Sequence, residues 1–117
     1  MNVNQELNRL EEITNLPVSP DIYDGDEDNY ITYVYTDERP TFWGDDKVLA
    51  DKVTVQVNLF TVPKKNHMTL KHTIRDYLET LGEVNDISSW LETYTNAKNV
   101  EKIIRRTTFN VTIMKER

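Results

Sequence analysis

The chain contains no cysteine, which excludes disulfides, thiolate nucleophiles and cysteine-ligated zinc or iron–sulfur sites. Its three glycines are too few and too scattered to form a phosphate-cradling loop. Its two histidines, His67 and His72, would lie on different faces of a helix and so cannot share a metal ion. We therefore expect no catalytic residues, no metal site and no cofactor, and we expect the protein not to be an enzyme.

Long apolar runs are also missing. No segment approaches the roughly 20 apolar residues that span a bilayer, and the first residues do not have the basic-then-apolar pattern of a signal peptide. These absences predict a protein that is made in the cytoplasm and has no membrane partner.

The 117 residues fit one domain, which we place at 1–117. The formal net charge of −6 is unevenly distributed. Residues 21–51 hold two basic and ten acidic side chains, or −8, whereas residues 98–117 hold six basic and two acidic ones, or +4. The acidic balance argues against a surface built for duplex DNA. Two interpretations of the split stay open: charges that only solvate exposed faces, or head-to-tail contact between copies of the chain.

The spacing of apolar residues predicts an α+β fold, with a mostly antiparallel sheet of about four strands and two helices packed on one face. Apolar residues at helical spacing indicate the helices, and alternating or β-branched residues indicate the strands. The helices are expected at 4–16 and 70–81, and the strands at 30–36, 52–61, 87–95 and 102–114.

The segments between these elements have the composition of turns and loops. Ser19–Asp21 is expected to be a turn or an extended connection, and Gly82 a left-handed cap after the second helix. Residues 37–51 contain Pro40 and Gly44 among acids, which favours a long connection between strands. Residues 98–106 suit either a helix or a strand, and we predict a strand from Lys102 onward.

Two features of the acidic half are candidate functional sites. Asp24, Asp26 and Asp28 alternate like the start of a calcium-binding loop, but the glycine and the bidentate glutamate that such a loop needs later are absent. Phe42 and Trp43 stand among acids, where large aromatic side chains are unexpected. They either fold back over the second face of the sheet or anchor the chain in a neighbouring subunit.

Four segments between residues 30 and 61 carry a resemblance to a known family. They are Tyr30-Ile31-Thr32-Tyr33, the step Thr36-Asp37, the acidic stretch that ends in Ala50-Asp51, and Val55-Gln56-Val57-Asn58-Leu59-Phe60-Thr61. Together they look like the central block of small phage tail terminator proteins, also called tail completion or minor tail proteins of the head–tail joining region. The helix, the Trp- and Tyr-containing segment and the Arg- and Thr-rich strand that follow agree with it, so the similarity spans about residues 7 to 114.

The resemblance implies a structural subunit that caps the finished tail tube, ends its polymerisation and forms the head–tail joining surface, usually as a hexameric ring. The implied partners are further copies of the chain, the tail tube protein and a head-closure or connector protein. DNA would pass through the ring without specific binding, and the protein would reside in the tail or neck of the virion.

A ring needs a subunit interface and a bore, and the charge split suggests residues for both. We assign Asp24, Asp26, Glu27 and Asp28 to the bore or the tube-facing rim. The subunit interface is assigned to Phe42, Trp43, Asp45, Asp46, Arg105 and Arg106. Two alternative functions stay open: another neck or head-closure adaptor, and an acidic DNA-mimic inhibitor of a nucleic-acid-binding protein.

Overall fold

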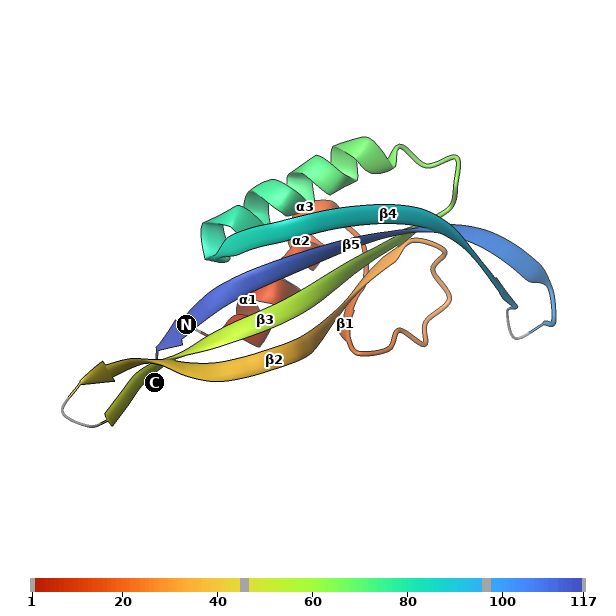
Figure 1. Cartoon of the computed structure of the whole chain (residues 1–117). Helices are drawn as coiled ribbons and strands as arrows, with labels where there is room; N and C mark the ends of the chain where they lie inside the picture. Colours follow the sequence, from red (N-terminus) through yellow and green to blue (C-terminus); the bar gives the residue numbers. More distant parts are fainter. Residues whose placement is uncertain (1, 45–46, 96–97, 117) are drawn as a thin grey trace.

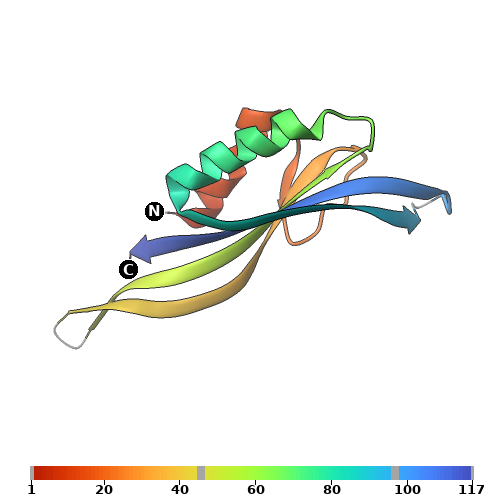
Figure 2. The same ribbon diagram turned by 45° about the horizontal axis from the view of Figure 1, so that its top comes forward.

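The computed structural model describes residues 2–44, 47–95 and 98–116. In these residues one mixed sheet has the strand order β1-β2-β3-β5-β4, and the helices lie against one of its faces (Figures 1 and 2). Only the edge pair β1–β2 is parallel. The helices are α1 (Val3–Asn8), α2 (Leu10–Thr14) and α3 (His67–Leu81), and the strands are β1 (Val18–Pro20), β2 (Tyr30–Gly44), β3 (Lys47–Thr61), β4 (Glu83–Thr95) and β5 (Glu101–Glu116).

The predicted fold class was wrong. The chain is mostly β, with 55% of its residues in strands and 24% in helices, and its mixed sheet adds the parallel edge strand β1 to the antiparallel strands that were expected. The helical layer of the described residues consists of three segments instead of two helices. Most of the difference comes from strands that run much further than their apolar patterns indicate.

The largest error concerns residues 37–51, which are paired strand and not a long connection. β2 continues to Gly44, β3 starts at Lys47, and the two pair antiparallel from Tyr30↔Phe60 to Gly44↔Lys47. Irregularities in the register occur between Tyr35 and Asp37 and on either side of Phe42. β1 pairs with β2 only at residues 31–33, so Pro40 lies on a free edge, where its missing N–H removes no ladder hydrogen bond.

The N-terminal segment also differs from its prediction. The helix expected at 4–16 is divided into α1 and α2, and its N-cap is Asn2, whose Oδ1 accepts a hydrogen bond from the Gln5 N–H at 3.1 Å. Asn15 ends α2 in the left-handed conformation, with φ 60°. Of the two alternatives for Ser19–Asp21, the extended one holds for Ser19 and Pro20, which belong to strand β1 and pair in parallel with β2.

The predictions for the second half were closer. α3 confirms the predicted helix and begins at the Asn66 cap, whose side chain accepts from the Thr69 N–H. Residues 101–106 are strand, so the ambiguous segment belongs to β5. Gly82 has φ −175° and ψ −155°, which is extended backbone and not the predicted left-handed cap.

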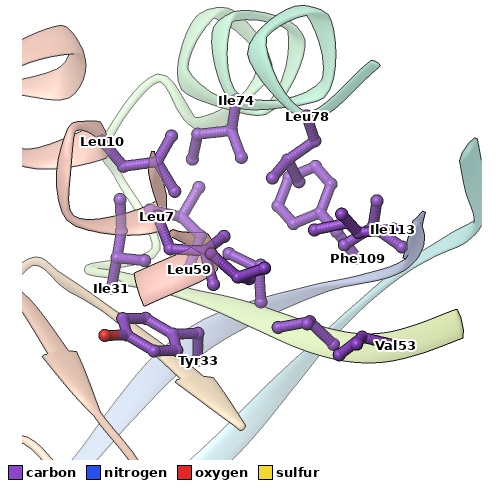
Figure 3. Close-up of a cluster of buried hydrophobic side chains, with 14 residues drawn as sticks. Leu7, Leu10, Ile31, Tyr33, Val53, Leu59, Ile74, Leu78, Phe109 and Ile113 are labelled. Carbon is purple, nitrogen blue, oxygen red and sulfur yellow. The ribbon is translucent and has the colours of Figure 1, made fainter. Parts of the chain in front are cut away.

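The hydrophobic core lies between the helices and one face of the sheet. Figure 3 shows α1, α2 and α3 contributing Leu7, Leu10, Ile74 and Leu78 to it. The predicted apolar face of β3 is confirmed, because its alternate valines and Leu59 are buried. The other buried side chains of the core are Val3, Ile31, Tyr33, Val53, Val55, Val57, Phe109, Val111 and Ile113.

Tyr77 joins the helices to one another and makes stability sensitive to alkaline pH. Its hydroxyl donates to the backbone oxygen of Glu6 at 2.8 Å and contacts the Glu6 carboxylate at 3.1 Å. Burial, followed by the Glu6 contact, raises the pKa of Tyr77 to about 12 from 10.0. Since the folded state holds this proton more tightly than the unfolded state, the stabilisation is complete below pH 10 and is lost as the pH rises towards 12.

We therefore expect Tyr77→Phe to lose less stability than the wild type between about pH 8 and pH 11, by on the order of 1 kcal/mol after allowance for solvent screening. Urea unfolding at the two pH values measures this. The readout is the difference between variant and wild type, because this difference removes the contributions of the groups that the two proteins share. Equal alkaline losses in the two proteins would contradict the role given to Tyr77.

Candidate functional site

Two hairpins extend past the helices in opposite directions and give the molecule extents of 58 × 27 × 23 Å (Figure 1). We call residues 37–51, the far part of the β2–β3 hairpin, the acidic hairpin. We call residues 89–106, the far part of the β4–β5 hairpin, the basic hairpin. Because β3 and β5 are central neighbours that run antiparallel, their hairpins point to opposite ends of the sheet. The sequence-predicted interface residues are therefore divided between the two ends of one subunit.

The acidic hairpin presents apolar side chains to solvent. Trp43 is 64% exposed and Leu49 is 53% exposed, the latter lying over Gly44. The backbone of Phe42 pairs with that of Ala50 in the β2–β3 ladder. Asp45 and Asp46, which were assigned to the interface, lie outside the described residues. The alternative that Trp43 folds back as a lid over the sheet does not fit its exposure.

The basic hairpin also exposes apolar side chains. Leu91 and Ile103 are 54% and 55% exposed. Leu91 pairs with Arg105 and Thr93 pairs with Ile103 in the β4–β5 register, so all four side chains share one face. That face is continuous with the helix-covered face, since it also includes buried Phe109. The helices stop short of the far part of this hairpin (Figure 2), so Leu91 and Ile103 stay exposed, while Arg105 lies beside the start of α3.

Arg105 and Arg106 point to opposite faces of the sheet, although the sequence analysis treated them as one interface pair. Successive strand residues alternate between faces, so Arg105 lies on the helix side and Arg106 on the open side. One partner surface lying on either face cannot contact both guanidinium groups. The alternation of apolar and polar residues at 107–113 already predicts a strand in which successive residues, such as Arg105 and Arg106, lie on opposite faces.

Arg106 is held by a network within the subunit. Its Nε and NH2 both donate to Asn58 Oδ1 at 3.2 Å, and its NH1 donates to Glu92 Oε1 at 3.3 Å. The guanidinium lies 5.4 Å from the ring centres of Phe60 and Trp90. The Trp90 indole N–H donates to the same Glu92 oxygen at 2.7 Å. A guanidinium held from so many sides has a structural role and offers little to a partner.

The Arg106 network is one end of a row of rings across the open face of the sheet. Tyr30, Phe60, Arg106 and Trp90 are register partners on four neighbouring strands. Tyr23 extends the row, because its ring stacks on Tyr30 at 4.4 Å and Tyr30 stacks on Phe60 at 4.8 Å. Burial is the main cause that raises the pKa of Tyr30. No pattern along the sequence indicates this row, because its members come from different strands and meet only through cross-strand pairing.

Substitution of Arg106 is expected to lower stability, whereas substitution of Arg105 is expected to change it little. Arg106→Ala removes three charge-assisted hydrogen bonds and leaves the Asn58 and Glu92 side chains without them, a loss of about 2 kcal/mol. Arg105→Ala is the matched control, one residue away on the other face. Thermal unfolding of both variants measures the effect. Equal melting temperatures for the two variants would contradict the structural role of Arg106.

Arg105 is the less engaged of the two arginines. Its NH1 donates a long hydrogen bond to Ser89 Oγ at 3.4 Å, and its Nε is buried without a hydrogen-bond partner among the described residues. It faces the start of α3, where burial, then Arg105 and Lys71, lower the pKa of His67. Arg105 is therefore a partly exposed cation with one weak hydrogen bond, and it lies beside exposed apolar side chains.

The acidic loop assigned to the bore contacts the basic hairpin of its own subunit. Asp28 Oδ1 lies 3.6 Å from Lys102 Nζ, and both residues are substantially exposed. Asp26, Glu27 and Asp28 line a cleft of about 690 Å³ together with residues of the basic hairpin. The remaining residues of this cleft are Tyr23, Gly25, Tyr30, Tyr94, Thr95, Lys98 and Lys102.

The acidic half of the sequence is thus two separate surfaces. The loop at 24–28 lies beside the basic hairpin, while the acidic hairpin lies at the other end of the molecule (Figure 1). The charge count along the chain identified the acidic segment but not its division. Only the sheet order separates the two surfaces in space.

Metal-binding groups, membrane-spanning helices and similarity to known proteins limit the possible functions of this chain only slightly. No group of three or more His, Asp or Glu side chains that could hold a metal ion occurs within 2–44, 47–95 and 98–116. In the same ranges no helix is long and apolar enough to cross a membrane. No protein-family model matches the chain, and no curated protein sequence is significantly similar to it.

Proposed function

We propose that this protein is a structural subunit that assembles head to tail into a ring, and that the ring caps a phage tail tube and joins it to the head. One observation carries the assembly part of the proposal: each end of the elongated subunit exposes apolar side chains on a hairpin. Trp43 and Leu49 lie at one end, and Leu91 and Ile103 at the other. The tail-terminator part comes from the sequence resemblance over residues 30–61.

The charges of the two hairpins support contact between unlike ends. Residues 37–51 contain five acidic and two basic side chains, or −3, and residues 89–106 contain four basic and two acidic ones, or +2. Unlike ends that attract one another make a heterologous contact, which produces a closed ring when the rotation between subunits is right. Like ends would repel, so a symmetric end-to-end dimer is disfavoured.

In this proposal the acidic loop faces the bore or the tube-facing rim of the ring. Asp24, Asp26, Glu27 and Asp28 are exposed, and they would repel the phosphates of passing DNA. The tail tube protein would contact one rim and a head-closure or connector protein the other. The protein would act without catalysis or cofactor, in the tail or neck of the virion.

Electron microscopy with negative stain tests the proposal directly. We expect purified protein to form closed rings with a central hole, six-fold as the resemblance implies, and to bind the ends of isolated tail tubes. Mass photometry over a range of concentrations should show the same oligomer, weakened by salt because the contact is between opposite charges. A protein that stays monomeric at high concentration and never binds tube ends would refute the proposal.

The alternatives have distinct outcomes in the same experiments. A head-closure adaptor would bind filled heads and leave tube ends bare. A DNA-mimic inhibitor would stay monomeric and bind a basic host protein in a salt-sensitive way. The inhibitor hypothesis gains no support from the fold, because the acidic side chains are divided between the two ends and Asp28 is paired with Lys102.

A further inference from the structure

The acidic hairpin cannot cover its own apolar residues. The helical layer packs on the central part of the sheet, and none of the described helices extends over the far part of the β2–β3 hairpin (Figures 1 and 2). Trp43 and Leu49 on this hairpin are accordingly 64% and 53% exposed. Trp43 is the most exposed large aromatic side chain among the described residues. A tryptophan at the end of a protruding hairpin has the size and placement of an interface anchor.

The helix-side face of the basic hairpin has the complementary properties. Leu91 and Ile103 form an exposed apolar pair on neighbouring strands, and Arg105, which is partly exposed although its Nε is buried, is the cross-strand partner of Leu91. Thr93 is the cross-strand partner of Ile103 and lies on the same face. An aromatic ring placed here would bury apolar surface and lie near a guanidinium group, which favours a cation–π contact.

We infer that Trp43 on the acidic hairpin of one copy docks on the helix-side face of the basic hairpin of the next copy, against Leu91, Ile103 and Arg105. This inference rests on the proposed ring and names its contact surfaces. The occupant is a second copy of this chain because the two hairpins carry −3 and +2, and because the docking parts lie at opposite ends of one molecule 58 Å long.

The open face of the same hairpin is the competing surface, and its chemistry is unsuitable. Its guanidinium group, that of Arg106, is held by Asn58 and Glu92 and stands beside Phe60 and Trp90. A docking ring would have to displace these contacts. Docking on the helix-side face displaces no such contacts. We therefore place the docked ring on the helix-side face and not on the open face.

Disulfide trapping distinguishes the two faces, and the natural absence of cysteine makes it clean. The test variant combines Lys47→Cys on the acidic hairpin with Thr93→Cys on the helix-side face. The matched control combines Lys47→Cys with Ser88→Cys, which lies on the open face of the same strand β4. All three positions are exposed, so the substitutions are expected to leave the fold intact.

A disulfide needs Cα atoms within about 7 Å of one another, so neither cysteine pair can close within one subunit whose hairpins lie at opposite ends. Under mild oxidation we expect the test variant to give a ladder of covalent oligomers up to the ring size on denaturing gels, with at least a five-fold excess over the control.

The other outcomes separate the inference from the proposed function. Rings that form but crosslink only in the Ser88→Cys control, or in neither variant, would overturn the docking surface and leave ring assembly standing. Absence of any oligomer by mass photometry, for the wild type and both variants, would refute the ring and the docking surface together.

Discussion

Trp43→Ala is expected to abolish ring assembly while leaving the fold intact. A tryptophan that dominates an interface contributes about 2 kcal/mol or more, which weakens each contact about 30-fold. A ring has one such contact per subunit, so the losses accumulate and monomers should replace rings at micromolar concentration. The melting temperature of the monomer should barely change, because the side chain is 64% exposed within the subunit. Mass photometry and thermal unfolding of the same sample measure both effects.

Trp90→Ala is the matched control for this experiment. Trp90 lies beside the Arg106 guanidinium and donates to Glu92 at 2.7 Å, so its loss should lower the melting temperature. The two tryptophan variants are therefore expected to show opposite behaviour: loss of assembly for Trp43 and loss of stability for Trp90. If Trp43→Ala instead assembled normally and unfolded at a much lower temperature, Trp43 would belong to the core and the docking surface would be wrong.

Of the three possible glycine-to-alanine substitutions, Gly82→Ala should cause the largest loss of stability. A Cβ at Gly82 would lie 2.1 Å from the Thr112 carbonyl oxygen and 3.1 Å from Ile113 Cα, all backbone of strand β5. Backbone in a central strand cannot move aside as a side chain can. Relief of the clash would displace the start of β4, where Glu83 pairs with Thr112, at a cost of about 3 kcal/mol.

Gly25→Ala is the control for this prediction. Its Cβ would also be close to other atoms, 2.2 Å from the Tyr23 hydroxyl, but that oxygen is the far end of a side chain that can rotate. We expect a loss below about 1 kcal/mol for Gly25→Ala. Urea unfolding of both variants gives the comparison. If Gly82→Ala were as stable as the wild type, the close approach between β4 and β5 would not exist as described.

The contrast at Gly82 shows how sequence reasoning reached the right residue for the wrong reason. The position after a helix predicted a left-handed cap, and the glycine is indeed needed there. Its φ of −175° is available to any residue, however, and the requirement comes from the neighbouring strand. That strand lies about 30 residues later in the chain, so no local pattern could show the contact.

The prediction of a long connection at residues 37–51 was wrong for a related reason. Acidic side chains, Pro40 and Gly44 are typical of loops, and local propensity alone cannot reveal pairing between two such segments. Their strand conformation depends on the ladder between residues 37–44 and 47–54 and on a free edge that tolerates Pro40. The expected division of charge was visible from the sequence, whereas the position of each charged segment in the sheet was not.

By itself, the sequence determined the amphipathic helix α3, the alternating core face of β3, the excess of acidic residues early in the chain and of basic residues at its end, and the lack of cysteine chemistry. These properties depend on residue type and on spacing along the chain. The tertiary structure alone decided that the two hairpins extend to opposite ends, that Arg106 is engaged on one face while Arg105 remains available on the other, and that the acidic residues form two surfaces. These properties depend on which strands pair, because strand order and register bring together residues that are far apart in the sequence.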